Sequence, residues 1–184
     1  MRKIPTVYLR DEADRSKVTD QVNPGCEWVL AGEGVPTRKY DGTCVMFDGS
    51  AWWARREVKP GKAEPSGFVA EQHDDVTGKT VGWEPMGASP FAKFHAEAIV
   101  GDETPGTYEL VGPRVQGNPD RYDRHTLVSH EDAMTPDQLY DASMGNNSPP
   151  KMLVAFVGRK YGWEGIVWHH ADGRMAKLKA RDLP

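Results

Sequence analysis

The sequence predicts an α+β fold built mainly from antiparallel sheets. Strand-like segments outnumber helix-like ones, and the two do not alternate as they do in doubly wound parallel sheets. Two Asp-Gly pairs also stand between strand-like segments, where hairpin turns are expected. A length of 184 residues suits a single domain, residues 1–184. A chain of this length buries enough of its surface to fold alone.

The expected strands are short runs rich in β-branched and aromatic residues, bounded by Gly, Pro or Asp. In chain order they are residues 6–10 (TVYLR), 26–30 (CEWVL), 43–47 (TCVMF), 51–55 (AWWAR), 106–112 (GTYELVG) and 164–170 (EGIVWHH).

Three helices are expected from capping signals and apolar periodicity. Residues 89–101 have Ser89 as N-cap and Gly101 as stop, and residues 135–145 begin with a Thr-Pro-Asp-Gln capping box. Residues 150–160 are expected to pair with the second helix across the NNSPP turn. Their apolar face is predicted to comprise Met152, Leu153, Phe156 and Val157.

The first hairpin is predicted from the Asp-Gly pair at 48–49. A two-residue turn there places Asp41 opposite Arg56. Directly opposed residues share a face of the sheet, so Lys39 is expected on the side of Asp41 and Arg56, whereas Arg55 points away.

The second hairpin is predicted from the Asp-Gly pair at 172–173. A two-residue turn there places Lys179 opposite Ile166, so Lys177, Lys179 and Glu164 are expected on one face. If the two hairpins face each other, their basic groups and carboxylates line one cleft. A one-residue bulge would break either inference.

Composition narrows the classes of partner. The net charge of −4 argues against a broad basic surface, so a nucleic acid would be held by local clusters such as residues 55–62 and 177–181. No window approaches the roughly 20 apolar residues of a membrane span. We expect a soluble monomer with reduced cysteines in the cytoplasm, or in the host cytoplasm if the chain is viral.

The segment KYDG at residues 39–42 matches the KxDG nucleophile motif of the covalent nucleotidyltransferases, which include DNA and RNA ligases and capping enzymes. The segments RRE, YELVGPRVQGNP, EGIVWHH and KLK follow in the order of that family, at residues 55–57, 108–119, 164–170 and 177–179. The series resembles ATP-dependent RNA ligases of the bacteriophage T4 RNA ligase 2 type, and still more the small single-domain RNA ligases of eukaryotes and viruses.

The resemblance implies an ATP-grasp-like nucleotidyltransferase domain, with antiparallel sheets flanking a nucleotide cleft. Because the chain stops at Pro184, we expect no C-terminal oligonucleotide-binding (OB) barrel. The implied enzyme uses ATP and Mg²⁺ (or Mn²⁺). It adenylates itself, transfers AMP to an RNA 5′-phosphate and seals that end to a 3′-hydroxyl.

The resemblance also assigns roles to individual residues. Lys39 is the nucleophile that attacks the α-phosphate and carries AMP, and a lysine crowded by other cations or desolvated is more readily deprotonated. Asp41 and Gly42 complete its motif. The remaining roles are nucleotide or 5′-phosphate contact for Arg56, ribose binding for Glu109, metal binding through water for Glu164, and α-phosphate binding for Lys177 and Lys179.

Other interpretations remain open. The chain is alternatively a DNA ligase, a capping-type nucleotidyltransferase, or a non-catalytic RNA- or nucleotide-binding module of the same fold. Taken singly, each lysine and carboxylate has the common interpretation of a solvated strand-edge charge. The residue that stacks on adenine is unassigned between Leu127 and His130, and at most one of the adjacent His169 and His170 can face the cleft.

Overall fold

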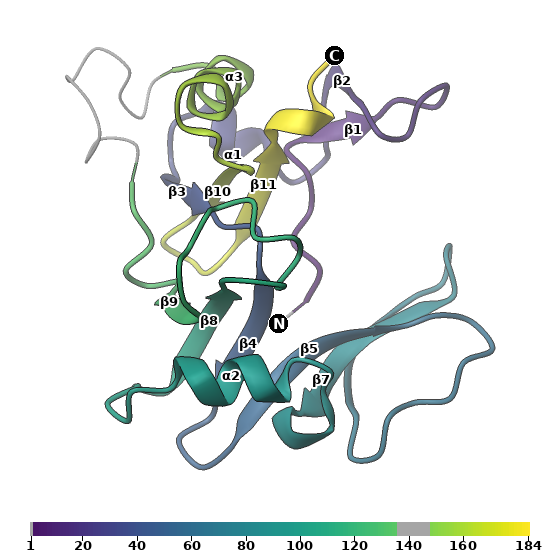
Figure 1. Cartoon of the computed structure of the whole chain (residues 1–184). Helices are drawn as coiled ribbons and strands as arrows, with labels where there is room; N and C mark the ends of the chain where they lie inside the picture. Colours follow the sequence, from purple (N-terminus) through teal and green to yellow (C-terminus); the bar gives the residue numbers. More distant parts are fainter. Residues whose placement is uncertain (1, 136–147) are drawn as a thin grey trace. The chain divides into compact units, whose positions relative to one another are not determined.

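The computed structural model describes residues 2–135 and 148–184 (Figure 1). These residues form two compact units. Unit 1 comprises Asp41–Asp132 together with the N-terminal residues up to Lys3, and unit 2 comprises Ile4–Tyr40 and the described part of Ala133–Pro184. The prediction of a single domain remains a prediction, and each unit is described by itself.

Unit 1 is built on a six-stranded antiparallel sheet with the strand order β6-β7-β5-β4-β8-β9. Its strands are β4 (Thr43–Phe47), β5 (Trp52–Val58), β6 (Val69–Asp74), β7 (Lys79–Pro85), β8 (Gly106–Val111) and β9 (Thr126–Ser129).

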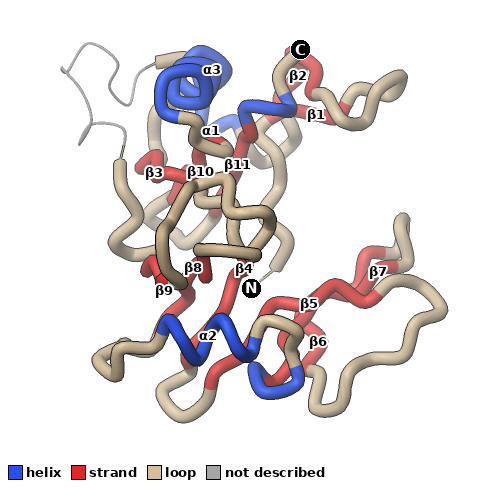
Figure 2. Tube along the Cα trace, in the orientation of Figure 1, coloured by secondary structure: helices blue, strands red, loops and turns tan. Residues whose placement is uncertain are grey.

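One face of this sheet is covered by helix α2 (Ala92–Ala98), which follows a short 3₁₀ turn at Met86–Ala88 and packs against β9 (Figure 2). The predicted helix at 89–101 is therefore present but shorter, because Ser89 forms a turn with Phe91 before the helix begins. The core under α2 contains Val45, Ala54, Met86, Ala98, Tyr108, Leu110 and Val115.

The β4–β5 hairpin has a longer turn than predicted. The Asp48 carboxylate accepts the backbone N–H groups of Ser50 and Ala51, and this closes a four-residue loop, so that Phe47 pairs with Trp52. These hydrogen bonds hold the pKa of Asp48 well below its usual range. The predicted register is therefore wrong by two residues, a shift that leaves each β5 side chain on the face predicted for it.

Unit 2 contains a three-stranded antiparallel sheet with the order β11-β10-β3 and a separate two-stranded ribbon, β1-β2. The strands are β1 (Tyr8–Arg10), β2 (Val18–Val22), β3 (Val35–Lys39), β10 (Gly165–His169) and β11 (Met175–Lys179). Residues 26–30, predicted as a strand, instead form helix α1 (Glu27–Leu30), which buries Trp28 and Val29.

Helix α3 (Pro150–Tyr161) covers one face of the three-stranded sheet and packs against β10 and β11 (Figure 1). The helix predicted at 150–160 is confirmed, but Met152 is exposed and Val154 takes its expected place in the core. The helix ends at Gly162, whose φ of 69° is the left-handed conformation typical of a helix C-terminus. A short 3₁₀ helix at Ala180–Asp182 follows β11. The helix predicted at 135–145 falls almost wholly outside the described residues.

The β10–β11 hairpin also departs from its predicted register. Ile166 pairs with Leu178 and Gly165 pairs with Lys179, one residue away from the prediction. The cause is a longer turn, in which the His170 N–H donates to the Arg174 carbonyl. Ile166 therefore faces the core and not the lysines.

The predicted class is confirmed: the described residues form an α+β structure of mostly antiparallel sheets with few helices. None of the described helices has the length and apolar character needed to cross a bilayer.

Candidate nucleotide-binding residues

In unit 2, backbone pairing sets three lysines on one face of the β11-β10-β3 sheet. Gly165 in the central strand pairs with Lys39 on one side and with Lys179 on the other. Two residues further along the central strand, Val167 pairs with Thr37 on one side and with Lys177 on the other. Paired residues and alternate residues share a face of a sheet, so Lys39, Lys177 and Lys179 lie on one side, which we call the lysine face. Ile166 and Leu178 lie on the opposite side, in the core.

Glu164 joins two of these lysines. Its Oε2 lies 2.5 Å from Lys39 Nζ, and its Oε1 lies 2.5 Å from Lys179 Nζ and 3.6 Å from an Arg181 guanidinium nitrogen. The Glu164 side chain is only 5% exposed, whereas those of Lys39 and Lys179 are 19% and 17% exposed. One buried carboxylate thus bridges two partly accessible ammonium groups.

The electrostatic balance at Glu164 favours its charged form. Burial by itself raises the pKa of the carboxyl, but the charges and hydrogen bonds of Lys39 and Lys179 outweigh it and leave the pKa below the ordinary 4.5. Lys39 Nζ also donates to the carbonyl of Tyr40, at 3.2 Å.

The predicted grouping of Glu164 with the lysines is therefore correct for Lys179, although the register that predicted it is wrong. Glu164 lies just before β10, and its carbonyl accepts the N–H of Ala180, which extends the hairpin by one pair. Contact with Lys39 comes from β3, a strand that none of the sequence runs predicted and that ends at Lys39.

One histidine shares the lysine face, as the alternation argument allows. His169 Nε2 lies 3.0 Å from the Thr37 hydroxyl on that face. His170, just beyond the strand, contacts Glu33 at 3.1 Å instead.

The other four predicted residues belong to unit 1. Asp41 and Gly42 precede β4, and both backbone N–H groups are bound by carboxylates: Asp41 donates to Asp120 at 2.9 Å and Gly42 donates to Glu109 at 3.1 Å. A side chain on Gly42 would meet the Leu110 carbonyl at 2.2 Å. The glycine of the KxDG motif is therefore required by its packing against β8.

Glu109 lies in the middle of β8, in one row with Cys44 and Val128, and is nearly buried. We call its side of the sheet the Glu109 face; α2 and the core lie on the other side. The second oxygen of Glu109 is 3.1 Å from Nε2 of His130. Of the two residues considered for adenine stacking, His130 therefore contacts Glu109, whereas Leu127 faces the core side.

The two arginines of the RRE segment lie on opposite faces. Arg56 shares the face of Ala54 and Val45, opposite to Glu109, and its Nε is 3.8 Å from the buried carboxylate of Glu84. Arg55, by alternation, shares the Glu109 face. The predicted ground for preferring Arg56 was a face shared with Lys39. That ground is wrong, because the strand containing Lys39 pairs with β10 and not with β5.

The loop between β8 and β9 holds an unusual backbone. Four non-glycine residues within it have positive φ angles, namely Arg114 (67°), Gln116 (47°), Asn118 (55°) and Arg121 (56°). Such conformations are uncommon outside glycine and concentrate at functional sites. Asp120 and Gln116 of this loop contact Asp41 and Thr43, so the loop supports the residues that follow Lys39.

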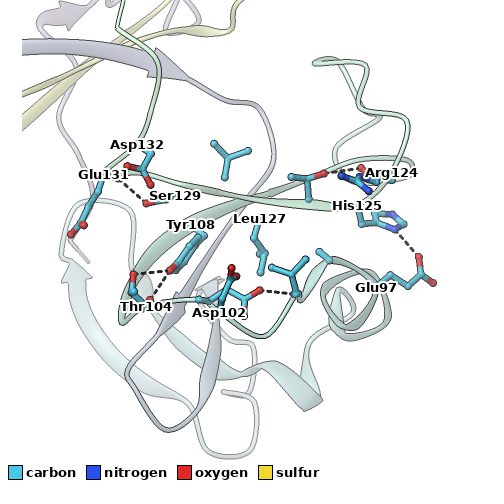
Figure 3. Close-up of a pocket in the computed structure, with 15 residues that line it drawn as sticks. Glu97, Asp102, Thr104, Tyr108, Arg124, His125, Leu127, Ser129, Glu131 and Asp132 are labelled. Carbon is cyan, nitrogen blue, oxygen red and sulfur yellow. Dashed lines mark hydrogen bonds and ion pairs between the residues drawn. The ribbon is translucent and has the colours of Figure 1, made fainter.

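A groove of about 620 Å³ lies elsewhere in unit 1, between α2, the loop after it, β8 and β9 (Figure 3). Its lining includes Glu97, Asp102, Glu131 and Asp132, together with Leu127. A groove with this many carboxylates repels a polyphosphate, so we do not place the nucleotide there.

Sequence reasoning missed Asp120 and His130 as contacts of the motif residues, Thr107 as the partner of His130, and Val128 as the neighbour of Glu109. These contacts depend on strand register and loop geometry, for which the sequence carries no local signal. No protein-family model matches the chain, and a search of curated proteins returned no relative with significant similarity.

Proposed function

We propose that the protein is an ATP-dependent RNA ligase that adenylates itself on Lys39. The observation that carries the proposal is the group formed by Lys39, Glu164 and Lys179, with Lys177 on the same face. These residues come from three of the five segments whose order along the chain resembles that of the covalent nucleotidyltransferases. Neighbouring cations favour an uncharged, nucleophilic lysine, and a carboxylate beside it can hold a divalent cation.

In the proposed reaction Lys39 Nζ forms a bond to the α-phosphorus of ATP as the bond to pyrophosphate breaks. An ammonium ion has no lone pair, so Lys39 must first give up a proton to water, and its ion pair with Glu164 is lost at that step. Lys177 and Lys179 project from the same face and would bind the α-phosphate oxygens, where negative charge develops.

Glu164 would hold the divalent cation. In the described ranges 2–135 and 148–184, no group of three or more His, Cys, Asp or Glu side chains is arranged around a metal position. A single carboxylate fits Mg²⁺, which keeps most of its water ligands and binds proteins through one or two carboxylates. When bound, the cation would neutralise charge on the departing pyrophosphate.

In unit 1, Glu109 would bind the ribose hydroxyls, and Val128 beside it on the same face is our candidate for the apolar contact with adenine. AMP would then pass from Lys39 to an RNA 5′-phosphate, and a 3′-hydroxyl would attack that end and release AMP. The RNA partner is thus one with 5′-phosphate and 3′-hydroxyl ends.

The first test is the intact mass of the protein after incubation with ATP and Mg²⁺. We expect the wild type to gain one adenylyl group, and Lys39→Ala and Lys39→Arg to gain none. Lys39→Arg is the matched control, because it keeps a cation beside Glu164 whereas a guanidinium stays protonated and cannot attack. Adenylation of either variant would refute the assignment of Lys39.

The same measurement separates the alternatives. Attachment of GMP from GTP would identify a capping-type enzyme, and no attachment from either nucleotide would leave a binding module whose Lys39–Glu164 contact is structural. If AMP attaches, nicked duplex, single-stranded and hairpin RNAs with 5′-phosphates, compared with DNA counterparts, identify the polynucleotide that is sealed.

A further inference from the structure

Glu109 is held at one oxygen by Gly42 of the KxDG motif and at the other by His130, which the motif series does not include. Its Oε1 accepts the N–H of Gly42 at 3.1 Å, and its Oε2 lies 3.1 Å from Nε2 of His130. The other ring nitrogen of His130, Nδ1, lies 3.0 Å from the Thr107 hydroxyl, and the His130 backbone N–H donates to the Thr107 carbonyl at 3.0 Å. A chain of hydrogen bonds therefore runs from Thr107 through His130 and Glu109 to Gly42.

The direction of this chain follows from what each group can donate. An ionised carboxylate only accepts, so Nε2 of His130 must carry the proton that faces Glu109. In the neutral ring Nδ1 is then an acceptor, and the Thr107 hydroxyl can donate to it. Thr107 and Glu109 are alternate residues of β8 and share a face, so the His130 ring spans two successive side chains of that face.

The consequence is a carboxylate with a fixed orientation and unused acceptor capacity. Each oxygen of Glu109 has two lone pairs, and the contacts with Gly42 and His130 use one on each. Two acceptor positions remain, one on each oxygen. A ribose presents two vicinal hydroxyl donors, whereas a deoxyribose presents one.

We propose that His130, itself oriented by Thr107, is a positioning residue that fixes Glu109 to select ribonucleotides by their two hydroxyls. The inference rests on the proposed function, in which Glu109 binds the ribose of ATP. His130 does not touch the reacting atoms; it acts through Glu109.

The test compares His130→Ala with His130→Gln. The amide nitrogen of glutamine can replace Nε2 as a donor to Glu109, whereas alanine leaves that oxygen without its partner. Rates of Lys39 adenylation are measured against concentration for ATP and for 2′,3′-dideoxy-ATP, with Thr107→Val as a second variant that removes only the hydroxyl behind the ring.

We expect KM for ATP to rise about tenfold in His130→Ala with kcat little changed, as a loosened hydrogen bond to a charged group predicts. KM for 2′,3′-dideoxy-ATP should stay the same, so the preference for ATP falls by the same factor. His130→Gln should restore most of the preference, and Thr107→Val should give a smaller loss than His130→Ala.

Two failures are distinguishable. If the wild type forms no AMP adduct, the proposed function fails and this inference with it. If the wild type is adenylated but His130→Ala discriminates between the two nucleotides as the wild type does, only the role of His130 is refuted. Equal losses of rate with both nucleotides in His130→Ala would also refute it, because they would show general damage to unit 1. If His130→Ala unfolds below the assay temperature, the preference of Thr107→Val and His130→Gln for ATP over 2′,3′-dideoxy-ATP tests the role of His130 instead. A wild-type preference in both variants would then refute it, and a reduced preference in Thr107→Val would support it.

Discussion

Glu164 is a buried carboxylate that contacts Lys39 through one oxygen and Lys179 through the other. Burial disfavours its charge and the two lysines favour it, and the outcome is a pKa below 4.5. A group whose pKa is lower in the folded than in the unfolded state stabilises the fold above its unfolded pKa. That contribution is lost as the pH falls through the folded value.

The first prediction concerns stability against pH. Glu164→Gln should lower the free energy of unfolding near neutral pH on the order of 2 kcal/mol, because an amide cannot compensate the two lysines. As the pH falls from about 4.5 through the lower pKa of the folded carboxyl, wild-type Glu164 gains its own proton, so the difference in the free energy of unfolding between the two proteins should narrow. Thermal unfolding at several pH values measures this. A difference that stays constant down to strongly acidic pH would contradict the assigned charge state.

The second prediction concerns metal dependence. Glu164→Gln should raise the Mg²⁺ concentration needed for half-maximal adenylation, because the amide keeps the shape of the carboxylate but loses the charge that attracts a hard cation. Lys177→Ala and Lys179→Ala should lower the rate at every Mg²⁺ concentration, since their charge acts on the phosphate. Magnesium titrations of the three variants make the comparison. Wild-type rate and magnesium dependence in Glu164→Gln would place the metal elsewhere.

The third prediction compares the two neighbouring arginines. Arg55 shares the Glu109 face and Arg56 lies opposite, beside Glu84, so Arg55→Ala should impair ligation more than Arg56→Ala. This order reverses the one expected from the sequence alone. Ligation rates of both variants, with thermal unfolding as a control for folding, decide it. Equal losses of ligation rate in the two variants would contradict the prediction that only the arginine on the Glu109 face contacts the substrate.

At the scale of elements, two glycines show where strands approach too closely for a side chain. A Cβ on Gly165 would meet the Leu178 carbonyl at 2.1 Å, and one on Gly42 would meet the Leu110 carbonyl at 2.2 Å. Both carbonyl oxygens belong to the backbone of a neighbouring strand, and moving that backbone aside would cost free energy of folding.

The fourth prediction follows from these contacts. Gly165→Ala should destabilise the protein by about 2 kcal/mol or more, which corresponds to a drop of roughly 4–8 °C in Tm for a chain of this length. Gly87→Ala is the matched control, because nothing lies within 4 Å of a Cβ there. Equal melting temperatures for the two variants would contradict the close approach of β10 to β11.

Both hairpins were predictable as hairpins, and neither register was. An Asp-Gly pair indicates a turn, but the loop length depends on which hydrogen bonds close it. Asp48 closes a four-residue loop with its own carboxylate, and His170 and Arg174 close the second turn. A shift of two residues preserves the faces of β5, whereas a shift of one residue turns Ile166 from the lysines to the core.

Two elements were misassigned because of their context. Residues 26–30 have aromatic and β-branched residues that favour a strand, but they form α1 because Trp28 and Val29 pack into the core of unit 2. Strand β3 was missed because Pro36 and the charged Arg38 and Lys39 interrupt its apolar pattern. The contact between Lys39 and Glu164 joins residues 125 positions apart. The sequence predicted only that both residues would line one cleft, and it did not predict their direct contact.

At the scale of the whole molecule, the net charge of −4 leaves any RNA contact to local basic groups. The fifth prediction is therefore a modest salt dependence of RNA binding. With about three phosphates contacted, affinity for single-stranded RNA should fall roughly twentyfold between about 50 and about 200 mM salt, far less than for a broadly basic protein. Binding titrations at several salt concentrations measure the slope, and a slope several times steeper would reveal a larger basic surface.

The presence of Glu164 between Lys39 and Lys179 means that this patch already has an anion of its own. An incoming anion must therefore displace Glu164 before it can bind the two lysines. Chloride or another singly charged ion would replace the single negative charge of Glu164 with another single charge. Unlike Glu164, such an ion is not attached to the protein backbone, so it has no advantage over the carboxylate. In the proposed reaction a triphosphate would offer several negative charges at once and could replace Glu164 at both lysines. The built-in carboxylate would then disfavour the commonest single-charged ions in solution, and without a ligand it balances the charge of two neighbouring lysines.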